Sequence, residues 1–498
     1  MSPARVLAFV VAVLALLALI GQALPKEGAD LGLLTVHMPT AGDVLFAEKQ
    51  RRVDISEILA IEADSAASDT LAIGSLADTL LAASADSARK PIAFDESKLA
   101  PLEDRIRFHF PDQGASVLHP FFKSLQSAYA GKEPIRALHY GDSQIEGDRI
   151  TAYVRNKLQT QFHGSGPGLI AVLDVGPHFS VKRELSDNWQ RFSAMDPNLK
   201  KHAHKRYGAL SAYCRFTPAL PDSVALDSVP STGTITLSPD NRAYSKARAW
   251  TECRLFFGWH RAPLTLRMEA DGVELSEEVI EPQAGMLTRE WRFPSTPGSI
   301  TITLEGTDSP DVFGIALDGS TGVAMDNISA RGAAGYEFSK GDQAMLSRMF
   351  AELDTRLLIL QYGGNTLPNI KSKEEAERYG RFFGGVIARL RKQIPGASVV
   401  VIGPSDMSIK EGEDYVTRPF LEDVRDAMKL NALAQGAAFW DMYEAMGGRN
   451  SMVSWVQADP PLAAEDYTHF SPQGARKVGE LFYTALINEY AVYVKTVQ

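Results

Sequence analysis

Short, mostly apolar runs recur along the chain, at 135–140, 357–360, 399–402 and 438–440. Runs of this length that lie between polar segments are typical of strands buried on both faces of a sheet. The stretches between them have apolar residues every three or four positions, which predicts helices. Strands that alternate with helices favour a parallel sheet covered on both faces, so the pattern predicts an α/β fold with three layers.

The helices can be placed from the signals at their ends. Two of them run from about 373 to 392 and from about 418 to 434. After the first strand, Asp148 is expected to cap the N-terminus of a helix. The last helix has the strongest start signal, with Ser471 as its N-cap and Pro472 at its first position.

The middle of the chain breaks this alternation, because short strand-like runs follow one another there with turn residues between them. The clearest runs are 233–237, 253–257, 264–268 and 299–304. Short strands at this spacing predict an antiparallel β-sandwich. We assign the sandwich to 210–312, as an insert between a first part (99–209) and a second part (313–498) of the α/β domain.

The N-terminus carries an apolar run, residues 6–20, which predicts an export segment within residues 1–24. The run is shorter than the ~20 residues that span a bilayer but can be extended to residue 24. Both a cleaved signal and a retained inner-membrane tether through residues 6–24 therefore fit. Residues 25–98 are rich in Ala, Ser and Asp and bury too little apolar area to offset the entropy of ordering. We expect a low-complexity tether and a folded part in the periplasm or cell envelope.

The formal net charge of -10 comes from Asp and Glu spread along the chain. The sequence has no stripe of Lys and Arg of the kind that binds phosphate backbones, which argues against nucleic acid as a partner. The two cysteines, Cys214 and Cys253, fit either one disulfide or two buried thiols. They have no further Cys or His at metal-ligand spacing, so we expect no metal site.

A serine follows the first predicted strand, in the sequence Gly141-Asp142-Ser143. It stands between a strand and a helix, so its hydroxyl is expected at the carboxyl end of the sheet, where open α/β sheets bind ligands. Gly141 permits a tight turn at this point. Because Gly-Asp-Ser is also a common turn sequence, it does not establish a nucleophile by itself.

Three polar residues further along the chain supply the other groups that an activated serine needs. Asp466 and His469 lie just before the cap of the last helix, so one short loop can present an imidazole together with the carboxylate that orients it. Such a base makes a serine hydroxyl nucleophilic. Asn365 follows the strand that begins at residue 357, and its amide can donate a hydrogen bond to the oxyanion of a tetrahedral intermediate.

In combination, these blocks resemble the SGNH, or GDSL-type, hydrolase superfamily. The chain has the family's four blocks in the family's order, over roughly 133–175 and 313–490. They are a Gly-Asp-Ser block, a second block with a glycine, a Gly-x-Asn block and an Asp-x-x-His block. The resemblance implies a flavodoxin-like, three-layer fold and a serine hydrolase. The catalytic residues implied are Ser143, Asp466 and His469, and the implied oxyanion hole is formed by Ser143, Gly332 and Asn365.

Some positions match the family less closely. We take Gly332 from the block 327–333, and Gly208 is the competing choice for the second-block glycine. The usual Leu after the nucleophile is Gln144, and the usual Asp after the asparagine is Thr366. Neither change removes a catalytic group, but both place the chain outside the lipase-like branch.

The insert, together with the run 317–323 before the second block, looks like the exported peptidoglycan O-acetylesterase group, which has a carbohydrate-binding-like module within its SGNH domain. This resemblance implies an esterase that removes O-acetyl or other short acyl groups from an envelope polysaccharide such as peptidoglycan, with no metal or organic cofactor. Asp142 is then expected to bond nearby backbone. An O-acetyltransferase with the same site, or a carbohydrate-binding protein with an idle site, is the alternative.

Overall fold

The computed structural model describes residues 53–60, 94, 99 and 102–497, with gaps at 175, 177, 196–203 and 222, and nine isolated positions nearer the N-terminus (5, 6, 9, 13, 15, 29, 30, 35 and 36). Two of the short N-terminal pieces, β1 (Ala29–Asp30) and β2 (Thr35–Val36), pair antiparallel. Most of the predicted export segment and of the predicted tether lies outside the described residues, but residues 53–60 of the tether are described and contribute Ile55 and Ile58 to a buried hydrophobic cluster. Within the described part of the chain, no helix is long and apolar enough to cross a membrane.

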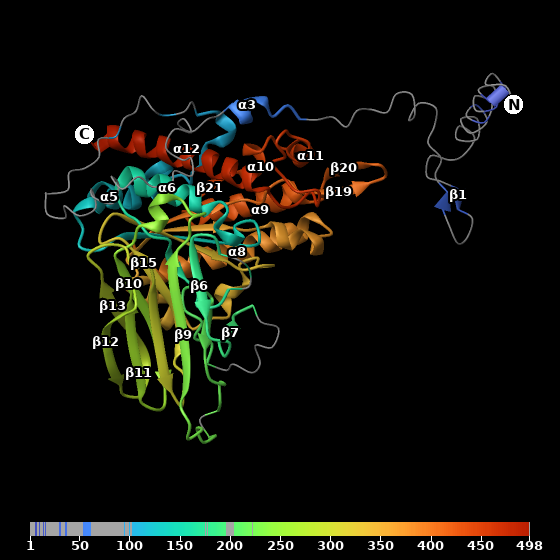
Figure 1. The fold of residues 1–498 in the computed structure, drawn as a ribbon. Coiled ribbons are helices and arrows are strands. Elements are labelled where there is room, and N and C mark those ends of the chain that lie inside the picture. Colours follow the sequence, from blue (N-terminus) through green and yellow to red (C-terminus); the bar gives the residue numbers. More distant parts are fainter. Residues whose placement is uncertain are drawn as a thin grey trace. The chain divides into compact units, whose positions relative to one another are not determined.

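The α/β part, which is the helix-rich portion of Figure 1, has at its centre a six-stranded sheet in the order β16-β4-β17-β18-β21-β3. Its strands are β3 (Phe108–His109), β4 (Ile135–Gly141), β16 (Val323–Ser329), β17 (Thr355–Gln361), β18 (Ser398–Ile402) and β21 (Ala438–Trp440). The first five in spatial order are parallel, and β3 pairs antiparallel with β21. Numbered along the chain, the parallel strands lie in the order 2-1-3-4-5, which is the flavodoxin-like order.

Helices cover both faces of this sheet because successive residues of each strand point to opposite sides. On β4, Leu138 packs into one hydrophobic cluster and Ala137 into another. The first cluster includes helices α7 (Gln343–Glu352), α8 (Lys373–Gln393) and α9 (Leu421–Ala434). The second includes α5 (His119–Ser127), α6 (Thr151–Phe162) and α12 (Pro472–Val497). The predicted three-layer α/β fold is confirmed.

Shorter elements complete the α/β part. They are α3 (Ser56–Ala60), β19 (Ser408–Glu411), β20 (Asp414–Thr417), α10 (Met442–Ala445) and α11 (Ser451–Val456). Of the two predicted caps, Ser471 is confirmed, since its Oγ accepts the Gly474 N–H at 3.1 Å. Asp148 as an N-cap is wrong: α6 starts only at Thr151, and the buried Asp148 carboxylate instead accepts two hydrogen bonds from Arg155, at 2.6 and 2.9 Å.

Two antiparallel sheets interrupt the α/β part, in the orders β13-β10-β15-β8-β7 and β12-β11-β14-β9-β6, and β5 also pairs with β15. Their strands are β5 (Gly168–Ile170), β6 (Val181–Leu185), β7 (Gln190–Ser193), β8 (Ala212–Arg215), β9 (Ser231–Pro239), β10 (Glu252–His260), β11 (Leu264–Ala270), β12 (Val273–Ile280), β13 (Gln283–Arg292), β14 (Ile300–Gly306) and β15 (Asp311–Asp318). These strands, here called the two-sheet insert, span 168–318 and exceed the predicted 210–312. The three early strands escaped prediction because they are short and two of them are mostly polar.

Apolar side chains from both sheets share one buried cluster, so the insert has a core of its own. Cys214 and Cys253 both belong to this cluster, and both are free thiols. Burial raises the pKa of Cys214 to about 11, which keeps its sulfur protonated and unreactive at neutral pH. The sequence allowed either one disulfide or two buried thiols, and the structure has two buried thiols.

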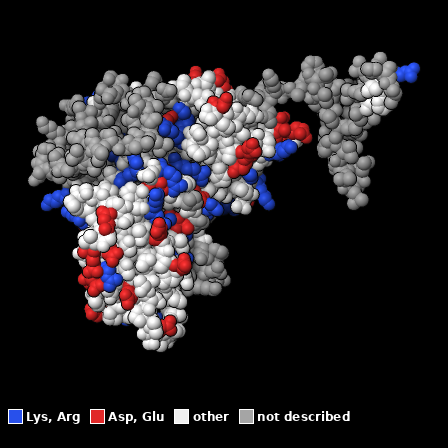
Figure 2. Space-filling view, in the orientation of Figure 1, with Lys and Arg blue, Asp and Glu red and all other residues white. Residues whose placement is uncertain are grey.

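The charge of the chain is not evenly spread over the surface. On the face shown in Figure 2, Lys and Arg side chains gather along the band where the α/β part meets the two-sheet insert, and most Asp and Glu lie to either side of it. The net acidic charge therefore coexists with a basic band on this face.

The segment that leads into the insert packs tightly against the strand that leads out of it. Gly166 has φ +92°, and a Cβ at this position would lie 2.1 Å from the carbonyl oxygen of Leu317 at the end of β15. Only glycine fits a left-handed backbone in such close contact with another chain segment. The entry and exit of the insert are thereby held side by side.

A buried cation lies at the same junction. Arg136 of β4 is fully buried; its Nη1 donates to Asp326 Oδ1 of β16 at 2.5 Å, and its Nη2 donates to Asp318 of β15. Asp326 Oδ1 also accepts the Leu169 N–H of β5 at 2.8 Å. One guanidinium therefore joins the central sheet to both ends of the two-sheet insert.

Replacing this cation tests its role. We expect Arg136→Leu to lower the free energy of unfolding by about 3 to 5 kcal/mol, because Asp326 then stays buried without a cation and Asp318 keeps only its contact with Arg254 at 3.5 Å. Urea-induced unfolding followed by tryptophan fluorescence measures the change. The control is Arg267→Leu, which breaks an exposed pair with Glu277 (2.8 Å) and should cost no more than about 1 kcal/mol. Equal losses in the two variants would contradict a special role for Arg136.

Candidate active site

The turn after β4 places Ser143 at the carboxyl edge of the sheet. In the 2-1-3-4-5 order, the direction of winding changes between β4 and β17, and ligands of such sheets bind at this point. Gly141 ends β4, and a Cβ there would come within 2.9 Å of the Ile145 side chain and 3.1 Å of the Gln361 carbonyl oxygen of β17. The glycine is therefore required for the nucleophile turn to fold back beside β17.

The structure brings the three predicted catalytic residues together. Ser143 Oγ lies 2.9 Å from His469 Nε2, although the two residues are 326 positions apart. His469 Nδ1 lies 2.7 Å from Asp466 Oδ2, and Asp466 Oδ1 accepts the backbone N–H groups of Thr468 and His469, each at 2.9 Å. Burial raises the pKa of Asp466, but these hydrogen bonds outweigh it, so its pKa lies below the ordinary value. Asp466 is thus held ionised against the imidazole.

Two residues that the sequence did not single out as functional connect the nucleophile turn to the histidine loop. Gln144 Nε2 donates to the Thr468 carbonyl oxygen at 2.6 Å. Arg149 Nη2 donates to the Ser143 carbonyl oxygen at 2.8 Å, and its Nη1 reaches the Phe470 carbonyl oxygen at 3.5 Å. In the sequence, the only sign of a role for Gln144 was that it replaces the usual Leu, and no sequence feature pointed to Arg149. Both side chains fix the position of the base relative to the serine.

Asn365 lies beside the serine turn, as predicted, in the short helix Gly364–Asn369 that follows β17. Its Nδ2 donates to Asp142 Oδ2 at 3.0 Å and to the Ala333 carbonyl oxygen at 3.1 Å. Asp142 Oδ1 also accepts the Gln144 N–H at 2.9 Å, which confirms that Asp142 bonds nearby backbone. Since both amide hydrogens of Asn365 already have acceptors, an oxyanion would have to share one of them.

The predicted second-block glycine, Gly332, lies in the loop after β16 with φ +77°. The loop is anchored on both sides of it: the Ala330 N–H donates to the Gly141 carbonyl oxygen at 2.9 Å, and Ala333 accepts from Asn365. The competing Gly208 lies elsewhere, where a Cβ would meet Met349 Sδ at 3.0 Å. The surroundings favour Gly332 over Gly208, and its role in the oxyanion hole stays a prediction.

An open cavity of about 440 Å³ lies over these groups. Ser143, His469 and Asn365 line one side of it, and Pro404, Met407 and Met442 contribute its apolar wall. A small acyl group would contact the apolar wall while its carbonyl faces the polar side. Among the residues that the structure describes, no three His, Cys, Asp or Glu side chains group as metal ligands.

The buried Asp142 gives a pH-dependent stability. Burial raises its pKa from 3.8 to about 6, so the folded state holds this proton more tightly than the unfolded state. Its stabilising contribution is complete below pH 3.8 and is lost as the pH rises through about 6. Between pH 4 and pH 7, the difference in unfolding free energy between wild type and Asp142→Asn should move by about 2 kcal/mol in favour of the variant. Urea titrations at several pH values measure it, and parallel pH profiles would contradict the raised pKa.

Comparison with known proteins agrees with this geometry. Residues 299–477 match the sequence model of the GDSL-like Lipase/Acylhydrolase family. The matched segment contains Gly332, Asn365, Asp466 and His469 but not Ser143, which the two-sheet insert separates from it. No match was found among curated proteins.

Solved structures resemble the chain in fold. One described as a peptidoglycan O-acetylesterase is 22% identical, with a TM-score of 0.58 over 75% of this chain and 96% of that one. Two others match more weakly. A Bacillus subtilis protein is 12% identical, with a TM-score of 0.28 over 64% of this chain and 95% of that one. An acetyl xylan esterase is 15% identical, with a TM-score of 0.26 over 33% of this chain and 81% of that one. The chain therefore contains a GDSL-like acylhydrolase domain over residues 299–477, and it shares the fold of an SGNH-type hydrolase.

Proposed function

We propose that this protein is a serine esterase that removes O-acetyl or other short acyl groups from an envelope polysaccharide, with peptidoglycan as the leading candidate. The observation that carries the proposal is the continuous hydrogen-bonded chain from Ser143 Oγ through His469 to Asp466. A nucleophile, a base and an orienting carboxylate in this geometry are the groups that acyl transfer requires.

In the proposed reaction, His469 Nε2 takes the proton of Ser143 Oγ as that oxygen attacks the ester carbonyl carbon. Asp466 stabilises the imidazolium that forms. The negative oxygen of the tetrahedral intermediate receives hydrogen bonds from the Ser143 and Gly332 amides and from the Asn365 side chain. The intermediate expels the sugar oxygen, which takes the proton from His469. Water, activated by the same histidine, then hydrolyses the acyl-enzyme and restores the serine.

The polysaccharide substrate is proposed on three grounds. The solved structure with the same overall arrangement is described as a peptidoglycan O-acetylesterase, and the match covers 96% of that chain. The cavity at Ser143 is small and suits a short acyl group. The apolar run at 6–20 suits an exported protein, cleaved or tethered, that meets polysaccharide in the cell envelope.

Hydrolysis is favoured over transfer to a sugar hydroxyl because the base is open to water. The His469 side chain keeps 34% of its surface exposed and that of Asp466 keeps 51%. A transferase has to exclude water from its acyl-enzyme, because water would hydrolyse it before the sugar acceptor reacts. The exposed base argues for water as the acceptor.

Substitution of the triad tests the proposal. With the full chain, we expect release of acetate from O-acetylated peptidoglycan, with kcat lower by ~10⁶-fold in Ser143→Ala and by ~10⁴-fold in Asp466→Asn. Acetate is measured by a coupled enzymatic assay, with acetylated xylan as a second substrate. Lack of serine-dependent release from every acyl ester tried would refute an esterase, and release that requires an added sugar acceptor would indicate a transferase.

The oxyanion hole is tested separately. We expect Asn365→Ala to lower kcat by ~10²- to 10³-fold with little change in KM, because its hydrogen bond strengthens only as the negative charge develops. Steady-state kinetics on p-nitrophenyl acetate give both constants.

A structure of the protein phosphonylated on Ser143 provides the control for this assignment. The phosphonyl oxygen should accept hydrogen bonds from Asn365 Nδ2 and the Gly332 N–H. A Gly332 amide that points away from this oxygen would overturn the choice of glycine.

A further inference from the structure

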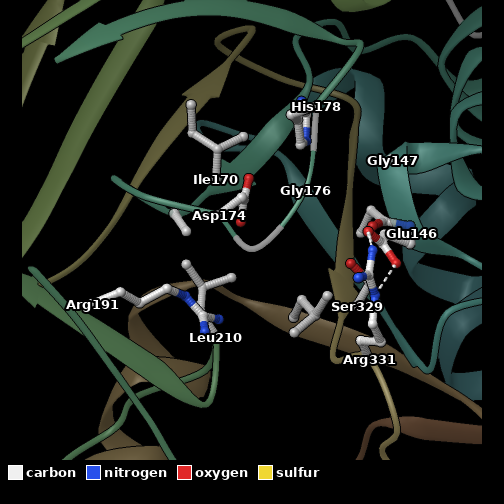
Figure 3. A pocket seen from close by; sticks show the side chains of 13 residues that line it. Glu146, Gly147, Ile170, Asp174, Gly176, His178, Arg191, Leu210, Ser329 and Arg331 are labelled. Carbon is white, nitrogen blue, oxygen red and sulfur yellow. Dashed lines mark hydrogen bonds and ion pairs between the residues drawn. The ribbon is translucent and has the colours of Figure 1, made fainter.

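A second, partly open cavity, of about 590 Å³ when the solvent space at its mouth is included, lies beside the catalytic turn where the α/β part meets the two-sheet insert. Figure 3 shows its walls: Glu146, Ser329 and Arg331 stand on one side, and Asp174 and Arg191 come from the insert on the other. We call it the lateral cavity. It shares none of its lining residues with the cavity over Ser143.

The lateral cavity lies close to the nucleophile along the same sheet edge. Ser329, the last residue of β16, is the direct neighbour of Gly141, the last residue of β4. Glu146 follows the nucleophile turn, and its N–H donates to the Ser143 carbonyl oxygen at 3.3 Å. Neighbouring strands are ~4.8 Å apart, so the lateral cavity begins about one strand away from the catalytic turn. A polymer bound at Ser143 can therefore place a neighbouring unit in it.

The charged side chains of this cavity are not equivalent. Glu146 pairs with Arg331, with contacts of 2.5 and 3.1 Å. Asp174 pairs with Arg183 at 3.0 Å. Arg191, on β7, has no ion pair or hydrogen bond to its side chain among the described residues, and its Nε is fully buried without a partner. Figure 3 shows the Arg191 guanidinium reaching toward the middle of the cavity.

A partly buried guanidinium without a counter-charge loses hydration that nothing in the described structure replaces. Both carboxylates of the lining are already neutralised by another arginine, so neither compensates Arg191. A bound anionic ligand would compensate the charge of Arg191. A planar carboxylate matches the geometry of a guanidinium and accepts two parallel hydrogen bonds from it.

We propose that the lateral cavity is a subsite for a carboxylate-bearing sugar residue, bound through Arg191, next to the sugar that is deacylated at Ser143. The inference rests on the proposed function for the identity of its ligand as part of an acylated glycan. Arg191 acts on substrate selection and not on the chemical step, because it contacts no group of the triad. The protein would thus prefer acidic glycans to neutral ones.

The test uses the full chain and a matched pair of ligands: an oligogalacturonate, and the same oligosaccharide with its carboxylates converted to primary amides. Calorimetry measures binding of both. We expect the acidic form to bind ~10- to 100-fold more tightly than the amide, as for hydrogen bonds to charged groups, and less tightly as salt is added. Arg191→Gln should abolish this preference, and Arg191→Lys should retain part of it.

The control variant is Arg381→Gln, which removes an exposed positive charge on α8. It should bind both ligands as wild type does. Equal binding of the two ligands by wild type, an equal loss for both in Arg191→Gln, or the same loss in Arg381→Gln would each overturn the subsite.

Kinetics separate this inference from the proposed function. On O-acetylated forms of the two oligosaccharides, Arg191→Gln should raise KM for the acidic one and not for its amide. If no acyl ester is hydrolysed but carboxylate-dependent binding is seen, the esterase proposal fails and the subsite stands. If esters are hydrolysed without any carboxylate preference, only the subsite fails.

Discussion

The interaction on which this structure depends is the burial of Arg136 between two carboxylates. A guanidinium removed from water is strongly unfavourable unless it is paired, and here its partners are Asp326 on the neighbouring strand and Asp318 at the end of the two-sheet insert. Arg136 stands on β4, the strand that ends in the nucleophile turn. The charge requirement therefore fixes the insert against β4, the strand that leads into the Ser143 turn, and with it the register of β16 beside β4.

That fixed junction lets a site be assembled from distant segments. The serine turn, the loop with Asn365 and the loop with His469 come from three separate connections at one sheet edge. Side chains then tie them together: Asp142 bonds Asn365, and Gln144 bonds the backbone of the histidine loop. Because these contacts are polar and largely buried, each loop holds its position only when the others are in place.

The sequence was sufficient where local patterns decide the structure. Apolar runs predicted β17 and β18 because parallel strands are apolar on both faces, and the blocks around Ser143 and His469 predicted the triad. It failed where side-chain contacts of the folded chain decide. Asp148 looked like a helix cap, but the buried Arg155 on the following helix takes its carboxylate. The early strands of the insert are short and pair with strands far along the chain, so β6 and β7 gave no signal of their own. The links made by Gln144 and Arg149 depend on the folded loops and could not be inferred from spacing.

Asp142 shows that the site is arranged for function at some expense of stability. Burial raises its pKa to about 6, so at neutral pH the folded protein holds an ionised carboxylate that its surroundings disfavour. In this ionised state it can accept from both the Gln144 N–H and Asn365 Nδ2. An amide in its place would turn a donor toward one of these two donors. A carboxylate is therefore the side chain that holds the turn of Ser143 and Asn365 together, and it does so best above its raised pKa.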